Sequence, residues 1–174
     1  MAFDRARSLI RDVPDFPHPG ILFKDITPVL GDAAAFSQII DGLAERLGGL
    51  GISRIAAVES RGFLFGAALA DRLKLPLAPI RKLGKLPYQT DRVEYALEYG
   101  TGTLEAHVDA IKPGDTVAVV DDLLATGGTA WAAAQLVQKQ GGKVGVFLFA
   151  IELEFLKGRD RLGAQARVES LIRY

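Results

Sequence analysis

Apolar segments of strand length alternate with segments of helix length through most of this 174-residue chain. The strand-like segments are residues 52–60, 75–82, 116–122 and 143–153. Helix-like patterns cover residues 33–50, 62–73 and 129–140. Continuous apolar runs are typical of strands that are buried on both faces, and their alternation with helices is typical of parallel sheets. The sequence therefore predicts an α/β fold with a parallel, doubly wound sheet.

The composition agrees with one globular domain over residues 1–174. Hydrophobic residues make up 49% of the chain, and no internal repeat or linker-like segment interrupts it. Lys+Arg equals Asp+Glu at 21 each, so we expect neither a nucleic-acid partner nor a membrane surface. No cysteine is present, which excludes disulfides and thiolate chemistry. The first residues lack an apolar signal segment and the longest apolar runs are too short to span a bilayer, so we expect a cytoplasmic protein.

Polar residues follow each predicted strand at the point where it ends. The apolar parts of these strands, residues 52–58, 77–80, 116–120 and 143–151, are followed in turn by Glu59-Ser60-Arg61-Gly62, Arg81-Lys82, Asp121-Asp122 and Glu152-Leu153. Ligands of open α/β sheets bind outside the carboxyl ends of the strands. We therefore expect these residues to meet on one ligand-binding rim of mixed charge.

The segment 125–129, Ala-Thr-Gly-Gly-Thr, lies between the third strand and its helix. Backbone N–H groups at a helix N-terminus, with glycines that permit close approach, form a phosphate-binding loop. Neither a Walker loop nor a GxGxxG fingerprint is present, which disfavours a nucleoside triphosphatase. The alternative is a plain strand-to-helix turn capped by Thr126 or Thr129. The adjacent carboxylates of Asp121 and Asp122 favour the first interpretation, because they need solvent, a metal or hydroxyl groups, and sugar hydroxyls match them well.

Residues 117–130, VAVVDDLLATGGTA, resemble the phosphoribosyl-diphosphate-binding signature of the type I phosphoribosyltransferases. The segments DFPHPGILFKDITPVL, ESRGFLFG, RKLGKLP and LEYGTGTLE are similar to the members of that family that act on adenine, so the resemblance covers essentially the whole chain. It implies the family's sheet with a small N-terminal and C-terminal hood over the site, and a flexible lid loop at about residues 83–102. It also implies transfer of the 5-phosphoribosyl group to N9 of adenine, giving AMP and pyrophosphate, with Mg²⁺ and in a homodimer.

The resemblance also implies a role for each matching residue of the signature and the lid. The 5-phosphate would be held by Ala125, Thr126, Gly127, Gly128 and Thr129. Asp121 and Asp122 would face the ribose hydroxyls. Family members that act on 6-oxopurines carry a catalytic Asp where Ala125 stands, so the base chemistry is expected on the lid, at Glu98, with Tyr99 beside it. Without the resemblance, Glu98 is equally well interpreted as a solvated hairpin residue.

The base and the leaving group would be bound by residues from other segments. Phe23 would stack on adenine, backbone groups near Leu22 and Lys24 would bond its edge, and Leu153 would close the slot, although Leu22 and Phe23 could instead be ordinary core residues. Lys24 stands where many family members have Arg. Pyrophosphate would be bound by Ser60, Arg61, Gly62, Arg81, Lys82 and Lys85. Arg61 is also compatible with a surface charge at a helix start.

Mg²⁺ is expected on substrate oxygens and water, because no dedicated set of metal ligands is apparent and His18 and His107 are far apart in the sequence.

Two rival functions remain open. One is transfer to another base, namely hypoxanthine, guanine, xanthine or orotate, against which Ala125 and the FKDITPVL and LEYG segments count. The other is a non-catalytic sensor of purine status that binds nucleic acid, which would need a basic recognition element that the sequence does not show.

Overall fold

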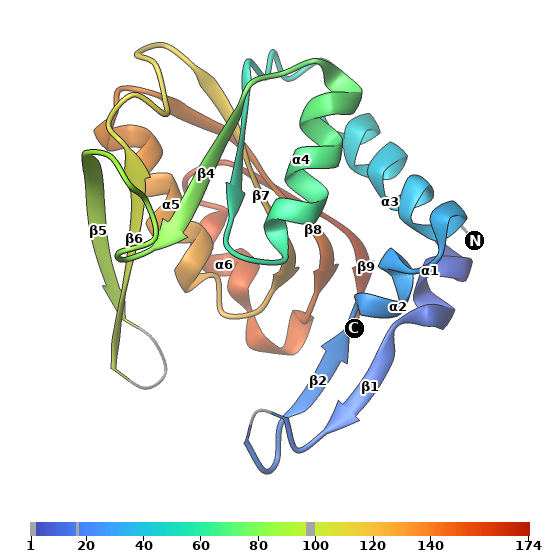
Figure 1. Ribbon diagram of the computed structural model, residues 1–174. Helices are drawn as coiled ribbons and strands as arrows, with labels where there is room; N and C mark the ends of the chain where they lie inside the picture. Colours follow the sequence, from blue (N-terminus) through green and yellow to red (C-terminus); the bar gives the residue numbers. More distant parts are fainter. Residues whose placement is uncertain (1–2, 17, 97–99) are drawn as a thin grey trace. The chain divides into compact units, whose positions relative to one another are not determined.

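Figure 1 shows the computed structural model, which describes residues 3–16, 18–96 and 100–174. The chain divides into two compact units, Met1–Gly42 and Leu43–Tyr174, and each is described by itself. The expectations of one domain over residues 1–174 and of a hood over the site stay predictions.

The Leu43–Tyr174 unit is built on a seven-stranded sheet of order β5-β6-β4-β3-β7-β8-β9. Its strands are β3 (Arg54–Val58), β4 (Leu77–Lys82), β5 (Thr90–Ala96), β6 (Thr101–His107), β7 (Thr116–Leu124), β8 (Lys143–Glu152) and β9 (Arg167–Arg173). The five strands from β4 to β9 in this order are parallel, whereas β6 and β5 continue the sheet antiparallel at one edge. The predicted parallel α/β sheet is therefore confirmed, with an antiparallel pair added to it.

Two helices connect neighbouring parallel strands in opposite directions along the sheet. Helix α4 (Gly62–Leu73) leads from β3 to β4, and α5 (Gly128–Lys139) leads from β7 to β8. Because such crossovers are right-handed, the two helices cover opposite faces, which makes the sheet doubly wound (Figure 1). The strand order reverses between β3 and β7, which is where open α/β sheets bind ligands.

Apolar side chains from the middle of the sheet form the core. Every residue of β3 is buried, and Phe147 and Phe149 of β8 are almost completely buried. Each such aromatic side chain contributes about 1.5–3 kcal/mol relative to an exposed one. Helix α4 lies close to the sheet at Gly66, where an added Cβ would come within 2.5 Å of the Ala57 Cβ. The rigid centre of the sheet thus fixes the ends of β3 and β7.

The Met1–Gly42 unit contains a hairpin that sequence analysis did not predict. It holds α1 (Asp4–Leu9), β1 (Arg11–Pro14), β2 (Leu22–Asp25), α2 (Thr27–Leu30) and the first part of α3 (Ala33–Arg46). The segment for which the resemblance implied a base-binding role contains Leu22–Asp25, which pairs antiparallel with Arg11–Pro14. Opposite charges across the hairpin support this pairing, since Lys24 lies 2.5 Å from Asp12 and Arg11 lies 2.8 Å from Asp25.

Several element boundaries differ from the expectation. The helix expected over 33–50 ends at Arg46, before Gly48 and Gly49, and β7 continues past residue 122 to Leu124. The part of the chain expected as a loop before residue 103 contains β5, which pairs along its whole length with β6. The lid at about 83–102 stays a prediction, and Glu98 and Tyr99 lie outside the described residues.

Candidate active site

A cleft opens at the carboxyl ends of β3, β4 and β7, at the point where the strand order reverses. Its volume is about 350 Å³. It is lined by Glu59, Ser60, Arg61, Lys82, Tyr95, Leu104, Asp121, Asp122, Leu123 and Thr129. The ends of three of the four strands that the sequence placed on one rim therefore come together, beside the start of α5. Glu152 and Leu153, at the end of the fourth strand, are buried and are not among the residues that line the cleft.

A second, smaller cavity of about 80 Å³ adjoins the cleft through Asp121 and Thr129. Its lining includes all five residues of the Ala125–Thr129 loop. Gly127 has φ 78°, a conformation that favours glycine, and it precedes the first residue of α5, Gly128. The first N–H groups of a helix have no partners within the helix, and the helix dipole favours an anion in front of them. The loop therefore has the geometry of an anion-binding site.

The acid pair lies within the last part of β7. The side chain of Asp122 is buried and forms an ion pair with Arg61 Nε, while Asp121 Oδ1 accepts a hydrogen bond from its neighbour's backbone N–H at 2.8 Å. Burial raises the pKa of Asp121 well above its ordinary value, and the adjacent Asp122 charge raises it further. A cation or hydroxyl donors placed near Asp121 would therefore be bound favourably.

Gly62 allows the start of α4 to lie directly against this acid pair. An added Cβ would lie 2.7 Å from Asp121 Oδ1 and 3.0 Å from the Val120 carbonyl oxygen. Any other residue would have to push β7 and α4 apart. Gly62 therefore acts by its small size, and Arg61 just before it brings a partly exposed guanidinium to the cleft.

Two buried or half-buried carboxylates organise the basic segment after β4, by which we mean residues 81–85 at the end of that strand and just beyond it. Glu59 Oε2 accepts hydrogen bonds from Arg81 Nε at 3.0 Å and from the Lys82 N–H at 3.1 Å. Glu105 Oε1 accepts the N–H of Lys85 at 3.0 Å, and Arg81 Nη1 donates to the Lys85 carbonyl at 3.0 Å. Arg81 thus has an acidic partner and Lys85 is fixed through its backbone, whereas Lys82 lines the cleft.

The residues expected around the base lie in both units. Leu22 is half exposed, Phe23 packs edge-on against Phe16 with ring centroids 5.1 Å apart, and Lys24 is paired with Asp12. All of these belong to the Met1–Gly42 unit. Leu153 belongs to the other unit, where it is buried and its N–H donates to the Leu124 carbonyl at 2.9 Å.

Sequence reasoning missed Glu59 and Glu105 as organising groups. A signal was present for Glu105, which is the single charged residue of the TLEA segment. Within the described ranges, no group of three or more His, Cys, Asp and Glu side chains gathers to hold a metal ion. Nor is any helix in those ranges long and apolar enough to cross a membrane.

A family model described as phosphoribosyl transferase domain matches residues 30–160. The chain belongs to the phosphoribosyl transferase family. Among curated members of this family, the adenine phosphoribosyltransferase of Sorangium cellulosum is 56% identical over 169 residues, covering 95% of this chain and 84% of the relative. That of Roseiflexus sp. is also 56% identical, over 95% of this chain and 96% of the relative.

Solved phosphoribosyl transferase structures share the fold. The adenine phosphoribosyltransferase of Thermoanaerobacter pseudethanolicus has a TM-score of 0.96 and 52% identity, with 99% of each chain covered. The Saccharomyces cerevisiae enzyme, solved in complex with an imino-altritol bisphosphate and adenine, has a TM-score of 0.91 and 38% identity, with 97% of each chain covered. The type I phosphoribosyltransferase fold inferred from the signature is therefore confirmed.

Proposed function

We propose that this protein transfers the 5-phosphoribosyl group from phosphoribosyl diphosphate to N9 of adenine, forming AMP and pyrophosphate. The observation that carries the proposal is the acid pair Asp121-Asp122 beside an anion-binding loop, in a cleft at the reversal of the strand order. The choice of adenine is supported by relatives that are 56% identical and are named adenine phosphoribosyltransferases.

The phosphoribosyl group would be held from two sides. The five residues Ala125, Thr126, Gly127, Gly128 and Thr129 would bind the 5-phosphate through backbone N–H groups and the two hydroxyls. Asp121 and Asp122 would bind the ribose hydroxyls, which lie one sugar ring away from the phosphate. The small cavity at the loop and the larger cleft adjoin through Asp121 and Thr129, which fits a ligand with a phosphate at one end and a sugar beside it.

The diphosphate would leave toward the basic side of the cleft. Arg61 and Lys82 would bind it directly, together with backbone groups at Ser60 and Gly62. Arg81 and Lys85 would act from the same segment, Arg81 partly through its pairing with Glu59. This arrangement would place positively charged side chains next to the diphosphate, which gains negative charge as it leaves.

Mg²⁺ is proposed as the metal, held by diphosphate oxygens and water. This fits a cleft in which the described carboxylates are only the Asp pair and Glu59, because Mg²⁺ usually keeps several waters and binds proteins through one or two carboxylates. When bound, it would neutralise part of the diphosphate charge.

Departure of pyrophosphate leaves positive charge on the ribose ring, as in glycoside hydrolysis. Asp121 and Asp122 would stabilise that charge while the loop keeps the sugar in place. Glu98 would take the proton from N9 as the new bond forms. Phe23, backbone groups near Leu22 and Lys24, and Leu153 would hold the base.

A lid at about residues 83–102 would carry Glu98 and Tyr99 over the cleft and exclude water, which would otherwise attack the same ring. The proposed assembly is a homodimer, as the resemblance implies. Cytoplasmic location also stays a prediction.

The test is AMP formation from adenine and phosphoribosyl diphosphate with Mg²⁺, run beside hypoxanthine, guanine and orotate. We expect turnover with adenine to exceed that with the other bases by at least about a hundredfold, since a site built to bond one base edge leaves polar groups unpaired with another. Glu98→Gln should lower kcat by about 10²–10⁴ with little change in phosphoribosyl diphosphate affinity. Preference for another base would refute the adenine assignment, and tight binding without turnover would favour a sensor.

A further inference from the structure

The Ala125–Thr129 loop is supported from behind by Gly158, the first residue of α6 (Gly158–Leu162). A Cβ added to Gly158 would lie 2.1 Å from the Ala125 carbonyl oxygen and 3.0 Å from the Gly127 nitrogen. A Cβ on Gly127 would in turn lie 2.8 Å from the Gly158 carbonyl oxygen. The two backbones are therefore in direct contact, and the shape of the loop depends on where α6 lies.

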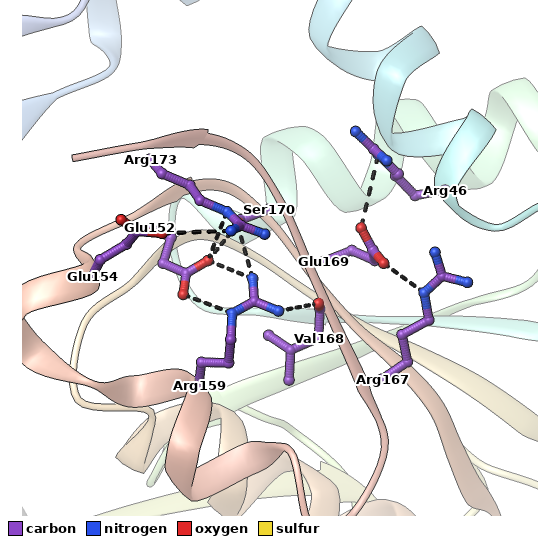
Figure 2. A network of polar contacts seen from close by, with 9 residues as sticks. All are labelled: Arg46, Glu152, Glu154, Arg159, Arg167, Val168, Glu169, Ser170 and Arg173. Atoms are coloured by element: carbon purple, nitrogen blue, oxygen red, sulfur yellow. Dashed lines mark hydrogen bonds and ion pairs between the residues drawn. The ribbon is translucent and has the colours of Figure 1, made fainter.

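Helix α6 has only five residues, so its position depends on contacts with the rest of its unit, and at its C-terminal end Leu162 is completely buried in the core. Arg159, next to Gly158, attaches it to the sheet (Figure 2). Its guanidinium binds both carboxylate oxygens of Glu152 on β8, at 2.9 Å through Nε and 2.6 Å through Nη2. The same group donates to the Val168 carbonyl on β9 at 2.5 Å and to Ser170 Oγ at 3.2 Å. One side chain thus connects α6 to two strands in a fixed geometry.

Glu152 is suited to hold this arginine firmly. The residue is buried, and its carboxylate also accepts a hydrogen bond from the Ser170 hydroxyl. Burial alone would raise the pKa of Glu152, but hydrogen bonds from Arg159 and Ser170 outweigh it and lower the pKa below its ordinary value. The carboxylate stays charged at neutral pH, so the pair is maintained where the enzyme would work.

We propose that Arg159 is a positioning residue for the phosphate-binding loop. Its bidentate pair with Glu152 fixes the N-terminal end of α6, and Gly158 at that end then holds Ala125 and Gly127 so that the loop N–H groups point into the cavity. The inference rests on the proposed role of the loop in binding the 5-phosphate.

The matched variants are Arg159→Ala, Arg159→Lys and Arg173→Ala. Arg173 is the control because its Nε also lies near Glu152, at 3.6 Å from Oε2, and 3.2 Å from Ser170 Oγ, but it is on β9 and not on α6 (Figure 2). Removing it takes a cation from the same carboxylate without detaching α6. Arg159→Lys keeps the charge and loses the bidentate fork.

The readouts are the KM values for phosphoribosyl diphosphate and for adenine, calorimetric binding of ribose 5-phosphate, and the thermal midpoint. We expect Arg159→Ala to weaken phosphoribosyl diphosphate and ribose 5-phosphate by about tenfold, which is about 1.4 kcal/mol, with the KM for adenine within about twofold. Arg159→Lys should give an intermediate loss. Arg173→Ala should leave all three affinities within about twofold even where it lowers the thermal midpoint.

Equal losses for Arg159→Ala and Arg173→Ala, or a folded Arg159→Ala that binds ribose 5-phosphate as the unsubstituted protein does, would overturn the inference. If Arg159→Ala does not fold, Gly158→Ala takes its place as the test variant, because the Cβ added at residue 158 would press directly on the loop. Normal ribose 5-phosphate binding by Gly158→Ala would also overturn the inference. Failure of the unsubstituted protein to bind ribose 5-phosphate at all would refute the proposed role of the loop itself, and this inference with it.

Discussion

Glu105 offers a sharp test of how the basic segment after β4 is held. Its buried carboxylate accepts the N–H groups of Lys85 at 3.0 Å and Leu86 at 3.1 Å through Oε1, and the Thr90 hydroxyl at 3.2 Å through Oε2. Arg92 Nε lies 3.5 Å from Oε2. The substitution Glu105→Gln keeps the size of the side chain and removes its charge. Oε1 can keep both backbone donors, but the new amide NH₂ would face the Arg92 guanidinium.

The size of the effect follows from these contacts. A hydrogen bond to a charged group contributes about 1.5–3 kcal/mol and a neutral one about 0.5–1.5 kcal/mol, so two N–H bonds lose about 2 kcal/mol together. Arg92 is largely exposed, and its pairing adds less than about 1 kcal/mol after solvent screening. A protein of this size loses roughly 2–4 °C of Tm per kcal/mol. We therefore expect Glu105→Gln to lower Tm by about 4–8 °C.

The assay is thermal and urea unfolding at pH 7, with Glu94→Gln as control, because Glu94 is an exposed residue on the neighbouring strand β5. The control should stay within about 0.5 kcal/mol of the unsubstituted protein. A loss for Glu105→Gln no larger than that of the control would refute the assignment of Glu105 as the anchor of this segment.

The pH dependence of the same pair of proteins gives a second check. Burial acts to raise the pKa of Glu105, but the N–H groups of Leu86 and Lys85 and the Thr90 hydroxyl outweigh it, so the pKa in the folded protein is below the ordinary 4.5. The carboxylate therefore stabilises the fold above about pH 4.5, and this stability is lost as the pH falls through the lowered pKa. The difference in stability between the unsubstituted protein and Glu105→Gln should narrow below about pH 4.5, and a constant difference down to pH 3 would contradict this reasoning.

Three further substitutions test the cleft itself. Gly62→Ala should lower kcat/KM for phosphoribosyl diphosphate by at least about tenfold in steady-state assays, because its Cβ would lie 2.7 Å from Asp121 Oδ1. Asp122→Asn removes an ionic partner of Arg61 and a group proposed to bind the ribose, and should lower kcat/KM by about 10–100-fold. Burial and the neighbouring charge raise the pKa of Asp121, so the stability that its protonated form contributes is lost as the pH rises through that pKa. Asp121→Asn should therefore be more stable than the unsubstituted protein in urea unfolding at pH 8, yet less active.

The sequence predicted those parts of the fold in which burial leaves a simple pattern. Strands β3, β7 and β8 are buried on both faces, so their apolar runs are continuous, and α4 was predicted with its observed bounds Gly62–Leu73. The exposed edge strand β5 was expected as a loop, because only Val93 and Tyr95 alternate with its charged residues. The last strand, β9, was not predicted, although its buried residues Val168, Ser170 and Ile172 follow the strand period of two.

The candidate site was predictable where one short segment supplies it. Asp121, Asp122 and the loop are neighbours in the chain, so the exit of one strand brings them together. Contacts between distant segments leave no local pattern. The pairing of Arg159 with Glu152, and the packing of Gly158 on Ala125, depend on how α6 returns to the sheet after β8. No spacing in the sequence identifies such pairs.

The two most buried glutamates, Glu105 and Glu152, share a feature that separates them from Asp121 in the cleft. Each has a lowered pKa, because several donors surround it, whereas the pKa of Asp121 is raised because burial and a like charge act on it without enough donors. A carboxylate whose bonds are all made within the protein can only position its neighbours. A carboxylate that lacks donors can gain them from a ligand. The direction of the pKa shift thus separates Glu105 and Glu152, which hold the basic segment and the Ala125–Thr129 loop, from Asp121, which would bind the sugar. Substitution of either glutamate should therefore change the geometry of the site without removing a group that touches substrate.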